Sequence, residues 1–207
     1  VRLVVIKEAR DGVSFDILNK EYSNSLQINP PHPRFSRGFD VKRDPKPGAI
    51  INTYVYGMTL NQYLDNGNLP LADAEYVFLS ALELLEHLHH QELIHGDISP
   101  NNILVDEATR LAYLIDFGNL HSFGEIDSIF GTRITYAPEI VNLKEVSSKS
   151  DIYSLGASFI HALLGRPARY LEKGDQEDGF GVKYMLDEEK LQYGQEYCDF
   201  LEILFKT

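Results

Sequence analysis

The chain has 207 residues, of which 43% are hydrophobic, enough apolar side chain for one large domain or two small lobes. Its formal net charge of -12 argues against a nucleic-acid partner, because proteins bind a phosphate backbone through concentrated Lys and Arg side chains. The single cysteine, Cys198, excludes an intrachain disulfide and a cysteine zinc site, and without an apolar run that could cross a bilayer we expect a cytoplasmic protein with no membrane segment.

The beginning of the chain is predicted to be β-structure with one helix. Residues 1–6 are mostly β-branched or apolar and predict a strand. Apolar residues with helical spacing predict a helix over 15–28, which the prolines that follow it bring to an end. Two further strands are predicted over 34–43 and 49–55, on either side of a turn rich in proline.

The rest of the chain is predicted to be mainly helical. Thr59 is expected to cap a short helix over 60–64. A wide apolar stripe over 71–90 is the strongest helical pattern in the sequence and predicts a helix in the core. Ser150 is expected to cap another apolar helix over 151–164.

A β-hairpin is predicted in the middle of the chain, with strands over 103–105 and 111–115 and a polar turn between them. With the centre of the turn at Thr109, Asn102 and Asp116 are equidistant from it, and antiparallel pairing is expected to bring them side by side. Amide and carboxylate oxygens are ligands that Mg²⁺ accepts when phosphates complete its shell.

A third polar group is expected close to this pair. Asp97 precedes Asn102 by a short stretch and adds a further carboxylate. Two oxygens that face a metal ion, together with a further carboxylate, are the groups that phosphoryl transfer uses. The residues alone therefore predict phosphoryl-transfer chemistry at the open end of the hairpin.

The sequence resembles the eukaryotic-type protein kinases in a series of motifs. In chain order these are Val4-Val5-Ile6-Lys7, Glu21, Thr53-Tyr54-Val55-Tyr56-Gly57, His95 to Asn102, Asp116-Phe117-Gly118, Gly131-Thr132, Ala137-Pro138-Glu139, and Ser150-Asp151 with the helix that follows. Each motif is a weak match alone, but their common order and spacing make the resemblance specific.

The resemblance implies an α+β, two-lobed, protein-kinase-like fold. A partial β-rich N-lobe is expected over 1–56, starting at the third strand of that lobe and without a glycine-rich loop. A mainly α-helical C-lobe is expected over 57–207, without its last helices. We therefore expect the chain to be part of a longer, multi-segment protein.

The resemblance also implies a role for each matching residue. Lys7 would hold the phosphates of ATP, oriented by an ion pair with Glu21, and Asp97 would accept the proton of the attacking hydroxyl. Asn102 and Asp116 would bind Mg²⁺. The remaining implied roles are contacts to adenine from the backbone of Thr53 and Val55 and the side chains of Val5 and Leu104, substrate positioning by Thr132, and structural support from His95, Phe117, Glu139 and Asp151.

The chain departs from the family pattern at three places. Gly96 stands where the family has the arginine that reads a phosphate on the activation segment, so activation by that phosphate is not expected. Ser99 stands where Ser/Thr kinases have a lysine that touches the γ-phosphate. Asn52 stands at the position that would guard the back of the nucleotide pocket, where a polar residue is unusual in the family.

The leading prediction is an ATP- and Mg²⁺-dependent protein kinase that phosphorylates Ser/Thr hydroxyls of protein substrates. Two alternatives stay open. A pseudokinase, acting as a binding or scaffolding module, is favoured by Ser99 and the unseen glycine-rich loop. A small-molecule phosphotransferase is favoured by Gly96 and Ser99.

Overall fold

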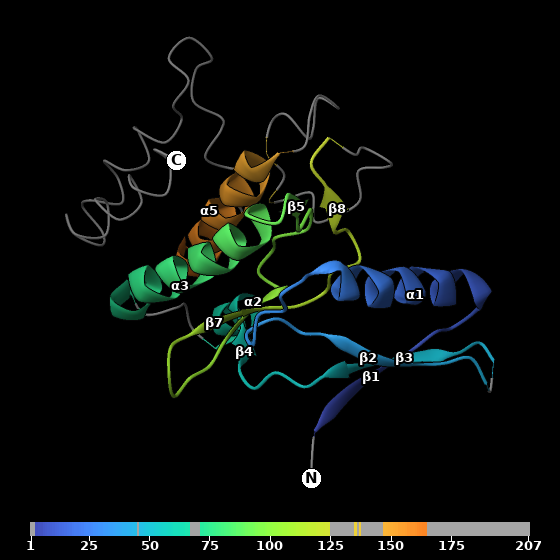
Figure 1. Ribbon diagram of the computed structural model, residues 1–207. Helices are drawn as coiled ribbons and strands as arrows, with labels where there is room; N and C mark the ends of the chain where they lie inside the picture. The colour runs from blue at the N-terminus through green and yellow to red at the C-terminus, as the bar shows by residue number, and fades with distance from the viewer. Residues whose placement is uncertain are drawn as a thin grey trace, which may run out of the picture.

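The computed structural model describes residues 3–44, 46–66, 71–124 and 147–164, together with Thr135 and Ala137. A three-stranded sheet has a helix lying along it, and a separate group of helices makes up much of the rest (Figure 1). In chain order the elements are β1 (Val4–Glu8), α1 (Gly12–Gln27), β2 (Gly38–Lys42), β3 (Ala49–Thr53), β4 (Met58–Thr59), α2 (Leu60–Asp65), α3 (Leu71–His89), β5 (Leu93–Ile94), β6 (Ile103–Val105), β7 (Ala112–Leu114), β8 (His121–Ser122) and α5 (Ser148–Leu164).

The first sheet has the strand order β1-β3-β2, with both pairings antiparallel. Val5 lies opposite Asn52, and Lys7 lies opposite Ile50. Because directly paired residues and residues two apart share one face of a sheet, these four side chains lie on the same face. Helix α1 lies along the sheet (Figure 1), and a hydrogen bond from Asn52 to Glu21 of α1 identifies this as the face turned towards the helix.

The predicted strand over 34–43 is shorter than expected. The backbone of Ser36 donates to the carbonyl of Leu114 (2.9 Å), and Leu114 donates to the carbonyl of Arg34 (3.1 Å). These residues therefore pair with β7, and the sheet strand β2 starts only at Gly38. The segment before β2 thus ties the first sheet to the central hairpin.

Helix α1 begins at Gly12, earlier than the predicted range, because Asp11 caps it. The side chain of Asp11 accepts a hydrogen bond from the backbone N–H of Ser14 (2.7 Å). The helix ends before Ile28, whose backbone is extended.

The hydrophobic core is centred on α3 and α5, which pack together (Figure 1). The rings of Phe78 on α3 and Phe159 on α5 meet edge to face with centroids 5.2 Å apart. The apolar stripe predicted for α3 is confirmed by its buried apolar residues, which are Ala74, Val77, Phe78, Ala81, Leu84, Leu85 and Leu88. None of the helices in the described ranges has the length and apolar character needed to cross a bilayer.

The cap predicted for α2 is confirmed and the one predicted for α5 is wrong. Thr59 and Gln62 form a reciprocal capping box: the backbone N–H of Gln62 donates to Oγ1 of Thr59 (3.1 Å), and that of Thr59 donates to Oε1 of Gln62 (2.8 Å). Helix α5 already begins at Ser148. Ser150 therefore lies inside its first turn, where its Oγ accepts a hydrogen bond from the backbone of Ser147 (3.2 Å).

The predicted hairpin exists, but its register differs by one residue. Ile103 pairs with Leu114, and the backbone N–H of Ile115 donates to the carbonyl of Asn102 (3.1 Å). Asn102 therefore lies opposite Ile115 and not opposite Asp116. The backbone N–H of Asp106 donates to the carbonyl of Leu111 (3.1 Å), so the turn itself spans only 107–110, and Oδ1 of Asp106 accepts two backbone N–H groups within it.

Candidate active site

A lysine and two carboxylates from three separate elements meet at the predicted site. Nζ of Lys7, on β1, lies 2.7 Å and 2.8 Å from the two carboxylate oxygens of Glu21, on α1. The same Nζ lies 3.3 Å from Oδ2 of Asp116, which follows β7. Residues that are far apart in the sequence are thus brought together as the kinase resemblance implies.

The charges of this cluster are not balanced. Burial lowers the pKa of Lys7, but the carboxylates of Asp116 and Glu21 outweigh it and raise that pKa above its ordinary value of 10.5. The pKa of Glu21 is also raised, first by burial and then by repulsion from Asp116, while Lys7 and Asn52 act in the opposite direction. Two carboxylates share one ammonium, so a further cation beside Asp116 would relieve the excess negative charge.

The backbone of Asp116 has a left-handed conformation, with φ of +65°. This conformation is uncommon outside glycine, and strained residues of this kind are concentrated at functional sites. Oδ1 of Asp116 accepts the backbone N–H of Gly118 (3.2 Å), which fixes the side chain across its own turn.

Asn102 and Asp97 are in direct contact. Nδ2 of Asn102 donates to the carbonyl of Asp97 (2.9 Å) and to its carboxylate Oδ2 (3.1 Å). Because both partners are acceptors, the amide nitrogen must face Asp97. The amide oxygen of Asn102 is therefore turned away from Asp97 and can serve as a ligand for a cation.

Asp151, at the start of α5, anchors the loop that carries Asp97. Its carboxylate is buried and accepts the backbone N–H groups of His95 (2.8 Å) and Gly96 (3.0 Å). It also lies 3.0 Å from Nε2 of His89 on α3, a contact that no sequence motif indicates. A buried carboxylate with three partners holds this loop rigidly against the helical core.

The remaining predicted residues divide into two groups. His95 and Phe117 are buried, and their rings pack with centroids 5.1 Å apart. Leu104 is buried in β6, directly after the loop. Thr132 and Glu139 lie outside the described residues.

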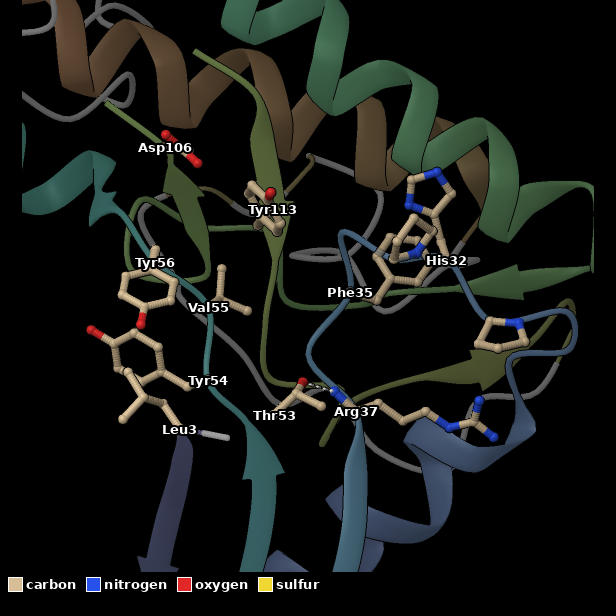
Figure 2. Close-up of a pocket in the computed structure, with 12 residues that line it drawn as sticks. Leu3, His32, Phe35, Arg37, Thr53, Tyr54, Val55, Tyr56, Asp106 and Tyr113 are labelled. Atoms are coloured by element: carbon tan, nitrogen blue, oxygen red, sulfur yellow. Dashed lines mark hydrogen bonds between the residues drawn. The ribbon is translucent and has the colours of Figure 1, made fainter. Parts of the chain in front are cut away.

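A cavity of about 740 Å³ adjoins the segment predicted to be the hinge. Figure 2 shows Thr53, Tyr54 and Val55 along it, with Tyr113 and Arg37 on other walls. Lys7, Asp97, Asn102 and Asp116 are not among its lining residues, so this cavity is separate from the charged cluster. Thr53 and Val55 line this cavity, and the contacts to adenine predicted for their backbone groups stay a prediction.

The described part of the chain holds no group of three or more His, Cys, Asp or Glu side chains that could bind a metal ion by themselves. A magnesium ion held by one amide and one carboxylate would need phosphate oxygens in its shell. The donor set thus fits a metal ion that arrives together with a nucleotide.

This sheet, helical core and Lys–Glu–Asp cluster define the protein-kinase class of fold. The family model described as Protein kinase domain matches residues 2–199. The chain therefore belongs to the protein kinase family, and the predicted α+β, kinase-like fold is confirmed.

Relatives named as Ser/Thr kinases occur in plants and bacteria. The chain is 29% identical over 178 residues to serine/threonine-protein kinase ATG1b of Arabidopsis thaliana, covering 79% of this chain and 24% of that protein. It is 30% identical over 172 residues to serine/threonine-protein kinase PrkC of Bacillus subtilis, covering 80% and 26%. It is 29% identical over 171 residues to serine/threonine-protein kinase PknB of Mycobacterium leprae, covering 77% of this chain and 27% of that protein. The chain thus spans about a quarter of the length of these relatives.

Proposed function

We propose that the chain is part of an ATP- and Mg²⁺-dependent protein kinase that transfers the γ-phosphoryl group to Ser/Thr hydroxyls of protein substrates. The observation that carries the proposal is the meeting of Lys7, Glu21 and Asp116 within hydrogen-bond distance. The direct contact between Asn102 and Asp97 adds the second half of the machinery. The names of the three relatives support Ser/Thr specificity.

The face of the first sheet that is turned towards α1 offers a suitable group for adenine. Asn52 is buried, and its Oδ1 has no hydrogen-bond partner among the described residues. Because its Nδ2 donates to Glu21 (2.9 Å), the oxygen is the free end of the amide. A buried acceptor of this kind favours a ligand that brings an N–H donor, such as the amino group of adenine.

The residues around Asp116 suit the other end of the nucleotide. Asn102 and Asp116 would hold Mg²⁺, which neutralises phosphate charge when it is bound. Lys7 would orient the phosphates, and its raised pKa keeps it charged at neutral pH. Asp97 would accept the proton of the substrate hydroxyl, while the hydrogen bond from Asn102 holds the carboxylate in place.

The two alternatives are less well supported. A pseudokinase does not require Lys7, Asp97, Asn102 and Asp116 all to be retained, yet all four are present and in contact in pairs. A small-molecule phosphotransferase shares this machinery, so only substrate assays separate it from a protein kinase. The substrate role of Thr132, the support role of Glu139, the lobe boundary near residue 56 and the cytoplasmic location stay predictions.

The test is phosphoryl transfer by the full-length protein from γ-labelled ATP to a generic protein substrate. Asp97→Asn keeps the size of the side chain but removes the proton acceptor, so we expect the rate to fall at least about 100-fold. Asp65→Asn, at the exposed end of α2, is the matched control and should leave the rate unchanged. Equal rates for wild type and Asp97→Asn would refute the proposal. Magnesium-dependent nucleotide binding by the wild type without any transfer would favour the pseudokinase.

A further inference from the structure

The buried face of α1 is polar. Its buried residues are Glu21, Asn24 and Ser25, whereas a helix packed on a core ordinarily buries an apolar stripe. Burying polar side chains is unfavourable unless each finds a hydrogen-bond partner. The position of α1 therefore depends strongly on specific hydrogen bonds, and Glu21 accounts for only some of them.

Asn24 makes the most extensive of these contacts. Its Nδ2 lies 2.8 Å from the carbonyl of Phe117, 3.2 Å from that of Gly118 and 3.3 Å from that of Leu120. An amide nitrogen has two hydrogens, so the three carbonyls share them. All three acceptors belong to the short segment that directly follows Asp116.

The orientation of the Asn24 amide is fixed from both sides. Its nitrogen faces three carbonyl oxygens, which can only accept. Its Oδ1 accepts a hydrogen bond from Nε2 of Gln27, one turn further along α1 (3.3 Å). The side chain of Asn24 is 5% exposed, so water does not replace these contacts readily.

Asn24 and Glu21 lie one turn apart on the same helix. Glu21 holds Lys7, and Asn24 holds the segment that begins with Asp116. Helix α1 therefore connects both partners of the 3.3 Å contact between Lys7 and Asp116. A shift of α1 would move the phosphate-binding lysine and the metal-binding carboxylate at the same time.

We propose that Asn24 is a positioning residue for Asp116, which it holds in place through the backbone carbonyls of the residues that follow Asp116. The importance of Asn24 for catalysis rests on the proposed function, but its role in holding the segment after Asp116 does not. Asn24 itself touches neither nucleotide nor metal, and acts by holding the carbonyls after Asp116 in one arrangement. The physical reason is that the segment after Asp116, whose carbonyls share one buried donor, is expected to have low mobility.

The first measurement is amide hydrogen exchange in the full-length protein with Asn24→Leu, which keeps the volume but removes the donor. We expect exchange over 117–120 to become at least about tenfold faster, because the segment loses its buried partner. Asn66→Leu, at an exposed position directly after α2, is the control and should leave exchange over 117–120 unchanged. Unchanged exchange in Asn24→Leu, or an equal rise throughout the protein, would overturn the proposal.

The second measurement is the affinity for ATP with and without Mg²⁺. In Asn24→Leu the gain in affinity that Mg²⁺ provides should fall at least about tenfold, because the supporting residues of a metal site set its affinity. An unchanged gain would overturn the positioning role. Should Asn24→Leu fail to fold, Asn24→Ser, which is too short to reach the carbonyls, is judged by the same two measurements. A wild type that shows neither magnesium-dependent binding nor transfer would refute the proposed function, while the exchange experiment would still decide whether Asn24 holds the segment.

Discussion

Gly96, where the family has an arginine, is predicted to tolerate no side chain. Its φ of +74° lies in the left-handed region, which favours glycine. A Cβ at this position would lie 2.7 Å from the backbone carbonyl oxygen of Asn119 and 2.9 Å from a ring carbon of His121. Since the first of these atoms belongs to the backbone, the contact cannot be relieved by rotating a side chain. Gly96→Ala should therefore destabilise the protein and displace the loop that precedes Asp97.

Two terms contribute to the expected magnitude. A non-glycine residue in the left-handed region is unfavourable by about 1–2 kcal/mol. Inserting a methyl group into a packed site adds about 1–3 kcal/mol. The sum is about 2–5 kcal/mol, which corresponds to a fall in Tm of about 4–20 °C for a domain of this size. Thermal unfolding followed by circular dichroism measures it.

Gly124 provides a matched control. Its φ is +80°, but a Cβ there would meet nothing within 4 Å. Gly124→Ala should therefore show only the backbone term of about 1–2 kcal/mol. The difference between the two variants isolates the crowding against Asn119 and His121. Equal falls in Tm would refute the reasoning, because they would mean that position 96 has room for a side chain.

Two further predictions concern charge and capping. The pKa of Lys7 in the folded protein is raised above its ordinary value of 10.5. The contribution of Lys7 to stability should therefore be fully present at a pH below 10.5 and be lost as the pH rises through the pKa of the folded state. The difference in Tm between wild type and Lys7→Met should thus persist from neutral pH and shrink only in this alkaline range, and a loss already at neutral pH would contradict it. Thr59→Ala removes the hydroxyl that caps α2 and should lower the free energy of unfolding, measured by urea titration, by about 1 kcal/mol. Thr59→Ser keeps a hydroxyl at this position and should therefore keep most of the stability of the wild type.

The sequence predicts best where the signal is local and repeated. Helix α3 has apolar residues at every turn, and the structure places its start and end within one residue of the predicted range. The cap at Thr59 is similarly local, because both partners of the capping box lie within one turn. In such segments the pattern and the packing favour the same structure.

The sequence predicts less well where competing hydrogen bonds decide. The hairpin register was wrong by one residue because the side chain of Asp106 shapes the turn, and alternation of apolar residues does not report that contact. Asn24 and His89 were not identified because their partners are far away in the chain, and neither side chain belongs to a recognisable motif. A sequence shows that a helix carries a polar residue, but it does not show which distant group that residue contacts.

The position of Ser99 bears on how the proposed active site would handle phosphate charge. Ser99 is fully buried, and its Oγ has no hydrogen-bond partner among the described residues. A lysine in this orientation would place an ammonium inside the core, which is strongly unfavourable. The positive charge that the structure places beside Asp116 is instead that of Lys7, held there by Glu21. Because α1 supplies Glu21, the charge that would face the phosphates depends on the placement of this one helix, and so does the segment that Asn24 holds. The departure at Ser99 therefore increases the importance of α1 for the proposed chemistry.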